Sequence, residues 1–256
     1  MRDFYTRFYA AVATSAANAA YCTRVYGRNL CQHGFADLSH LDHLIQVSAI
    51  GPQSRVLDLG CGNGMIAEYI ADQSGAHVTG IDLIEQAIQD AQARTQDKQA
   101  RLAFLVSDMA HLDFAPSSFD AVIAIDTLYF GDIDVTLQQV MPRLRPGGRF
   151  VAFFDQSCGP EVALEDYAPA QTLPDGTDLA LALQRCGLSY QTWEYTAEML
   201  AHVRRRRPVL AELRSQFAAE GNQFLYDSHL GEANGIERAY TNNAGRRYLY
   251  LANYQA

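Results

Sequence analysis

The feature that most constrains this 256-residue chain is the glycine-rich run GCGNG at residues 60–64. A short apolar stretch at 55–59 comes before it, and apolar residues at helical spacing follow it over 65–70. Glycine accepts positive φ angles and lets a ligand approach the backbone closely. The first N–H groups of a helix have no partner within the helix and attract polar ligand groups. The run therefore predicts a ligand-binding loop between a strand and a helix.

Short apolar runs alternate with segments of helical period along much of the remaining chain. Runs that are apolar at nearly every position are typical of strands covered on both faces, as in parallel sheets. Alternating strands and helices indicate βαβ units with right-handed crossovers. We therefore expect an α/β fold with a doubly wound, mostly parallel, seven-stranded sheet of Rossmann-like type. The expected strands lie at 55–59, 77–81, 102–106, 121–125, 149–154, 188–195 and 246–254.

Two long helical stretches interrupt this alternation. Residues 1–50 read as an N-terminal helical cap with a break near Gly27, and 197–245 read as a helical insertion that Pro208 must kink or divide. Both are longer than ordinary connections, and we expect them to hold the substrate over the strand ends. The expected segments are the cap at 1–50, the core at 51–196, the lid-like insertion at 197–245 and the last core strand at 246–256.

The spacing of the glycines separates two classes of cofactor. Dinucleotide-binding loops follow GxGxxG, but Met65 stands where the third glycine would be, and the glycines follow GxGxG instead. Asp82 ends the second expected strand, where a carboxylate can accept both hydroxyls of a ribose. Asp108 ends the third. A further acid in this layer does not suit a pyrophosphate, but it suits an adenine amino group and a cationic sulfonium.

With these motifs in this order, the region from about 55 to 155 resembles the class I S-adenosylmethionine methyltransferases. The glycine loop matches the motif that holds the cofactor's methionine part, and 119–122 and 144–148 match the stretches that open strands four and five. The resemblance implies S-adenosyl-L-methionine as cofactor and S-adenosyl-L-homocysteine as product. In that family, the acid at the second strand binds the ribose and the acid at the third binds the adenine amino group. The implied cofactor-binding residues are Asp58, Gly60, Gly62, Asp82, Leu83, Asp108, Met109 and Ile125.

Several classes of methyl acceptor are disfavoured by the sequence. The formal net charge of −9 opposes binding to nucleic acid phosphates. The Asp/Asn-Pro-Pro-Tyr loop used on exocyclic amino groups is absent, because IDTLY stands at 125–129. No Pro-Cys nucleophile for pyrimidine methylation appears. We therefore expect methyl transfer to N or O of a small molecule. The alternatives are a non-catalytic binder of S-adenosylmethionine and an RNA methyltransferase.

Candidate substrate-facing residues come from the cap and from the ends of strands four and five. His33 is either a general base or a capping histidine, so the catalytic residue stays unassigned. Aromatic residues at these places either form a water-excluding wall or belong to the core. The substrate-facing candidates are Tyr21, Gln32, His33, Tyr129 and Gln156.

Five cysteines form no CxxC pair and no metal-binding spacing, which is typical of free thiols in a reducing compartment. The alanine-rich segment at 8–21 is interrupted by polar residues, so we interpret it as an amphipathic helix rather than a signal peptide. No apolar run is long enough to span a membrane. We expect a cytoplasmic monomer or homodimer without a metal, a nucleic acid partner or a membrane partner.

Overall fold

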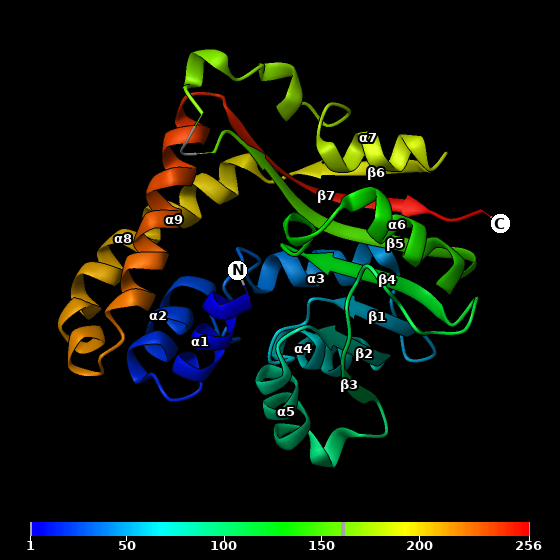
Figure 1. The fold of residues 1–256 in the computed structure, drawn as a ribbon, viewed down its shortest axis with the longest axis horizontal. Coiled ribbons are helices and arrows are strands. Elements are labelled where there is room, and N and C mark those ends of the chain that lie inside the picture. The colour runs from blue at the N-terminus through cyan, green and yellow to red at the C-terminus, as the bar shows by residue number, and fades with distance from the viewer. Residues whose placement is uncertain (1, 160–161, 256) are drawn as a thin grey trace.

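The computed structural model describes residues 2–159 and 162–255, so the outer limits of the segments 1–50 and 246–256 lie outside the described residues. It confirms the predicted fold class, with seven strands in one sheet of order β3-β2-β1-β4-β5-β7-β6 (Figure 1). β7 runs antiparallel to both of its neighbours, and the other pairs are parallel. The strands are β1 (Arg55–Leu59), β2 (His77–Asp82), β3 (Leu102–Val106), β4 (Phe119–Ile125), β5 (Leu144–Ser157), β6 (Ser189–Glu194) and β7 (Gly245–Asn253).

Helices cover both faces of this sheet because neighbouring strand residues point to opposite sides. Val56 of β1 belongs to the core shared with α3 (Leu38–Ser48), α4 (Met65–Ser74) and α5 (Glu85–Arg94). The next residue, Leu57, belongs to the core shared with α6 (Ile133–Val140) and α7 (Asp178–Arg185). Apolar residues at nearly every strand position are explained by these two buried faces. The segment α3, which we placed in the cap, packs on the sheet.

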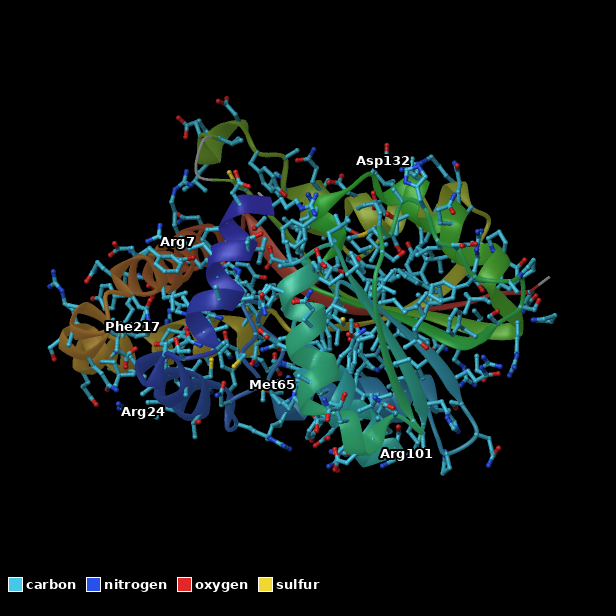
Figure 2. The ribbon with its side chains drawn as sticks, turned by 60° about the horizontal axis from the view of Figure 1, so that its bottom comes forward. Arg7, Arg24, Met65, Arg101, Asp132 and Phe217 are labelled. Carbon is cyan, nitrogen blue, oxygen red and sulfur yellow. The ribbon has the colours of Figure 1, made fainter. Side chains whose placement is uncertain are left out.

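Four helices form a separate cluster beside the sheet, on the left of Figure 1: α1 (Arg2–Val12), α2 (Ala16–Tyr26), α8 (Thr196–Ala219) and α9 (Gln223–Thr241). They share a core that includes Phe8, Tyr21, Leu210 and Phe217. Figure 2 shows Arg7, Arg24 and Phe217 on this side of the molecule. The two helical stretches that the sequence set apart, at opposite ends of the chain, therefore pack together.

Two local expectations were wrong. Pro208 lies inside α8, a helix of 24 residues, and does not divide it. The insertion divides instead at Gly221, where φ is +71°. Buried Val209, Leu210 and Leu213 keep the helix docked despite the hydrogen bond that proline cannot donate. The strand expected at 149–154 is longer at both ends, because β5 begins at Leu144 and ends at Ser157.

Among the helices in the described part of the chain, none is both long and apolar enough to cross a membrane.

Candidate active site

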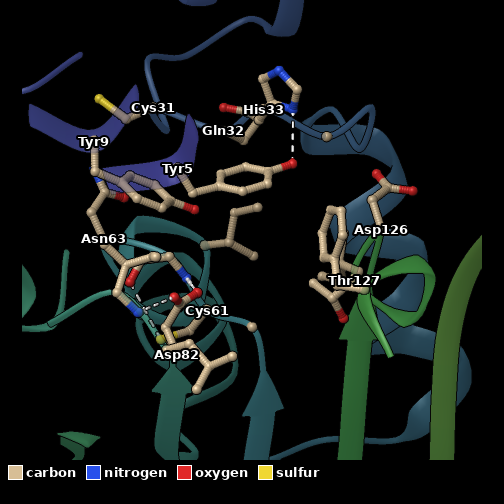
Figure 3. Close-up of a pocket in the computed structure, with 18 of the residues that line it drawn as sticks. Tyr5, Tyr9, Cys31, Gln32, His33, Cys61, Asn63, Asp82, Asp126 and Thr127 are labelled. Atoms are coloured by element: carbon tan, nitrogen blue, oxygen red, sulfur yellow. Dashed lines mark hydrogen bonds between the residues drawn. The ribbon is translucent and has the colours of Figure 1, made fainter. Parts of the chain in front are cut away.

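A cavity of about 530 Å³ lies where β1, β2 and β4 end, and helices α1 and α9 contribute to its other side (Figure 3). Its volume falls within the usual range for small-molecule sites. Ligands of open α/β sheets bind at such strand ends, where the strand order reverses. Sequence-predicted residues that line it are Gly60, Gly62, Asp82, Leu83, Met109, Ile125, Gln32, His33 and Tyr129.

The glycine loop forms one wall of the cavity. Its three glycines have φ angles of +69°, +56° and +74°, in the left-handed region that favours glycine. At each one, a Cβ would meet another side chain of the protein. It would lie 2.6 Å from Cγ2 of Thr127 at Gly60, 2.9 Å from Cζ of Tyr9 at Gly62 and 2.6 Å from Cζ of Phe104 at Gly64. Glycine at these positions therefore makes room for the protein's own side chains, and Gly60 and Gly62 also line the cavity, where a ligand can approach their backbone.

Asp82 lies beside this loop and fixes its shape. Its Oδ2 accepts a hydrogen bond from the Gly62 amide at 2.9 Å, and its Oδ1 accepts one from the Ile84 amide at 2.8 Å. Burial raises the pKa of the Asp82 carboxyl. Asp82 lines the cavity together with the apolar residues Leu83 and Met109. A carboxylate in this place can accept both hydroxyls of a ribose.

The other two acids lie outside the cavity wall. Asp58 is buried below the loop, and burial together with the Asp82 charge raises its pKa to about 8. Asp108 is half-exposed and accepts a hydrogen bond from the Ala110 amide at 2.8 Å, while its neighbours Ser107 and Met109 line the cavity. Neither carboxylate is among the residues that line the cavity, and their contacts with the cofactor stay predictions.

On the opposite side of the cavity, His33 lies among three polar groups. Its Nδ1 is 3.2 Å from the Tyr5 hydroxyl and 3.2 Å from Oε1 of Glu232, and its Nε2 is 3.1 Å from the Ser228 hydroxyl. Burial and nearby carboxylates raise the pKa of Tyr5, so its hydroxyl stays protonated. Oε2 of Glu232 is 3.2 Å from Nη1 of the buried Arg206. One Glu232 carboxylate therefore lies within reach of both the His33 ring and the Arg206 guanidinium.

An ion pair closes the wall between these two sides. Asp126, directly after β4, pairs with Arg247 of β7 through both carboxylate oxygens. Its Oδ2 also accepts a hydrogen bond from the Phe35 amide at 2.7 Å. A Cβ on Gly34 would lie 2.6 Å from this oxygen, so a glycine is needed where the segment crosses Asp126. The contact fixes the segment that carries Gln32 and His33.

Two predicted substrate-facing residues do not line the cavity. Tyr21 is fully buried in the core of the helical cluster, with its ring stacked on His229 at 4.3 Å. Gln156 accepts a hydrogen bond from the Asp178 amide at 3.0 Å, which caps the start of α7. Tyr21 is therefore a core aromatic residue, and Gln156 caps a helix.

The sequence did not point to Tyr5, Tyr9 or Glu232, all of which line the cavity, whereas Phe130, a candidate for the aromatic wall, lines it as well. Tyr5 and Tyr9 are spaced by four residues, so a helical projection would have placed them on one face of α1. Glu232 gives no such signal, because its role depends on how α9 packs against the segment carrying His33. Among the described residues, no group of three His, Cys, Asp or Glu side chains is placed to hold a metal ion.

Comparisons with known proteins agree with this geometry. Residues 56–148 match the family model for a methyltransferase domain. The chain is 34% identical over 151 residues to O-methyltransferase rstn1 of Aspergillus nomiae, covering 56% of this chain and 66% of that protein. It is 32% identical to sterol 24-C-methyltransferase ERG6B of Gibberella zeae, covering 51% of this chain and 34% of that protein. The chain thus spans between a third and two thirds of the length of these relatives.

Solved structures show the same fold. A Haemonchus contortus phosphoethanolamine N-methyltransferase 2, in complex with phosphomonomethylethanolamine and S-adenosylhomocysteine, superposes with a TM-score of 0.74. The match covers 94% of this chain and 57% of that one at 19% identity. The chain belongs to the class I S-adenosylmethionine-dependent methyltransferase family. The domain match and the strand order together establish this, and the family resemblance seen in the sequence is confirmed.

The family's cofactor can be tested against the residues of this cavity. Asp82 supplies a carboxylate for ribose hydroxyls between apolar walls. Gln32 donates from Nε2 to the Ala36 carbonyl at 3.0 Å, and its buried Oε1 has no hydrogen-bond partner among the described residues. A buried acceptor of this kind needs a donor such as an amino group. The residues present therefore fit an amino acid nucleoside.

Proposed function

We propose that this protein transfers a methyl group from S-adenosylmethionine to an oxygen or nitrogen atom of a small molecule. The observation that carries the proposal is that one cavity contains both Asp82 with the glycine loop and His33 with Glu232. A cofactor site and a candidate proton acceptor thus share one enclosed volume. The chain is similar to an O-methyltransferase, which supports transfer to oxygen, and to a sterol 24-C-methyltransferase, which supports a small-molecule acceptor.

Asp82, Gln32 and the glycine loop would hold the cofactor, which supplies a methyl group already activated by a sulfonium. The protein's own contribution is to align the acceptor and to exclude water. Tyr5, Phe35, Tyr129 and Phe130 surround the remaining volume with aromatic rings. These rings would hold a flat or apolar acceptor and keep water away from the reacting atoms.

His33 is the group placed to take a proton from the acceptor. If the neutral ring carries its proton on Nε2, that nitrogen donates to the Ser228 hydroxyl and Nδ1 accepts from the Tyr5 hydroxyl. When Nδ1 gains a proton, it donates to Oε1 of Glu232, 3.2 Å away. The carboxylate of Glu232 thereby stabilises the charged imidazole.

The charges near this half of the cavity favour an uncharged acceptor. The two buried guanidinium groups are already paired, Arg247 with Asp126 and Arg206 with Glu232. A phosphorylated acceptor would need several cations that are free to bind its phosphate, whereas the exposed Arg2 is the only Arg or Lys on the cavity lining in the described part of the chain. We therefore propose a hydroxyl or a neutral amine on a largely apolar molecule as the acceptor group.

The experiment is a transfer assay with tritium-labelled S-adenosylmethionine and five acceptors: 4-nitrocatechol, 1-decanol, aniline, phosphoethanolamine and bulk tRNA. We expect label in one or more of the first three. Label only in phosphoethanolamine or tRNA would contradict the proposed acceptor class. Failure of S-adenosylhomocysteine to bind would contradict the proposed function as a whole.

A substitution tests the role of His33 with an acceptor that is labelled. His33→Gln should lower kcat about 10²- to 10⁴-fold, the usual contribution of a general base, while binding of S-adenosylhomocysteine stays within about twofold. His111→Gln, at an exposed histidine outside the cavity, is the matched control. An unchanged kcat in His33→Gln would assign His33 a structural role instead.

A further inference from the structure

Helix α1 has two faces with different surroundings. Phe8 and Val12 are buried in the core of the helical cluster. Tyr5 and Tyr9, one turn apart, line the cavity on another face. Figure 3 shows both rings pointing into the space above Asp82 and the glycine loop. The N-terminal helix, expected from the sequence to serve the acceptor, therefore also borders the half of the cavity that contains Asp82.

Tyr9 of α1 lies directly against the glycine loop, at Gly62. A Cβ on Gly62 would lie closest to the Tyr9 hydroxyl oxygen, then 2.9 Å from Cζ and 3.0 Å from Cε1 of its ring, so only a glycine lets this side chain lie there. Beyond the loop, α1 packs against α5, on the sheet. The helix thus extends from the helical cluster across the glycine loop to the sheet layer and forms a cover over the site.

The hydroxyl of Tyr9 is available to a ligand. It makes no hydrogen bond to another described residue, and Figure 3 draws none from it. Burial and the nearby Asp82 charge hold the pKa of Tyr9 well above its ordinary value. The hydroxyl therefore stays protonated and can donate. Tyr9 is half-buried and lines the cavity, so a ligand there that carries an acceptor atom can receive this hydrogen bond.

We propose that Tyr9 is a cofactor-binding residue: its hydroxyl donates a hydrogen bond to S-adenosylmethionine, and α1 covers the bound cofactor. This inference rests on the proposed function. It adds a residue outside the glycine-loop region to the cofactor site and makes cofactor affinity depend on the N-terminal helix. If Tyr9 only packed against Gly62, removing its hydroxyl would leave the affinity for the cofactor unchanged. The measured affinity therefore separates packing from hydrogen bonding.

The test uses S-adenosylhomocysteine as probe and isothermal titration calorimetry of the full chain. Tyr9→Phe keeps the ring against Gly62 and should bind the probe about two- to tenfold more weakly, as expected for one lost hydrogen bond. Tyr190→Phe removes a tyrosine hydroxyl that bonds Asp175 away from the cavity, and it should bind as the wild type does. Circular dichroism melting verifies that each variant is folded.

A second measurement tests the cover without any substitution. Hydrogen exchange of the backbone amides over residues 2–12 should slow when S-adenosylhomocysteine is added. Equal affinity of Tyr9→Phe and wild type would overturn the role of the hydroxyl, and unchanged exchange over α1 would overturn the cover. If the wild type does not bind the probe at all, the proposed function itself is contradicted, and the role of Tyr9 falls with it.

Discussion

Asp126 and Arg247 are 121 residues apart in the sequence, yet they form a buried ion pair at the cavity wall, with Nη2 and Oδ2 3.0 Å apart. The pair joins the end of β4 to β7, and the Phe35 amide attaches a third segment to the same carboxylate. Asp126 has a φ of +56°, an uncommon value for a residue other than glycine. The surrounding contacts hold this backbone conformation, and they set the position of Gln32 and His33 relative to the strand ends.

Removing one partner of this pair should be strongly destabilising. Asp126→Asn leaves the Arg247 guanidinium buried without its counter-charge, and we expect a loss of about 3–5 kcal/mol of unfolding free energy. Urea denaturation followed by circular dichroism measures it. Asp134→Asn, which breaks the exposed pair with Arg185, is the control and should have little effect. Similar small losses in both variants would show that the buried pair does not fix the wall.

Two glycine substitutions separate the steric clash of a Cβ at Gly60 from the backbone strain of a positive φ angle. Gly60→Ala places a Cβ 2.6 Å from Thr127, whereas Gly147→Ala has a similar φ of +77° and meets nothing within 4 Å. Both substitutions should cost about 1–2 kcal/mol for the left-handed conformation. Gly60→Ala alone should lose stability beyond this amount, because of the clash with Thr127, and should also weaken S-adenosylhomocysteine binding. Equal effects in thermal melts and calorimetry would mean that Thr127 simply moves aside.

Asp58 makes a specific prediction about pH. Because burial raises its pKa from 3.8 to about 8, the folded state retains a proton that the unfolded state releases. The stability that this group contributes is therefore fully present below about pH 4 and is lost as the pH rises towards about 8, by at most about 1.4 kcal/mol per pH unit.

The measurement is the unfolding free energy of the wild type and of Asp58→Asn between pH 5 and pH 8.5. An asparagine stays neutral, so the difference between the two proteins should shift in favour of the variant as the pH rises. Asp113→Asn, at an exposed position, should follow the wild type. Parallel pH profiles for Asp58→Asn and wild type would show that Asp58 is ionised in the folded protein.

The parts of this structure that the sequence predicted are those encoded locally. The alternation of strands and helices, the glycine loop and Asp82 depend on residues within one βαβ unit, so spacing alone located them. The contacts of His33 depend on α9, and the pairing of Asp126 depends on β7, far along the chain. No local pattern records such contacts. Tyr21 and Gln156 were misplaced for the same reason, because a residue near a strand end or in a cap helix can point towards the core or a neighbouring helix.

The central claim is that the cavity at the ends of β1, β2 and β4 binds S-adenosylmethionine through Asp82. Calorimetric titration of wild type and Asp82→Asn with S-adenosylhomocysteine tests it most directly, since the asparagine retains one oxygen but removes the charge. The account predicts saturable binding to the wild type and affinity at least about tenfold lower in the variant, because a hydrogen bond to a charged acceptor contributes about 1.5–3 kcal/mol. No binding to the wild type, or equal binding to both proteins, would contradict it.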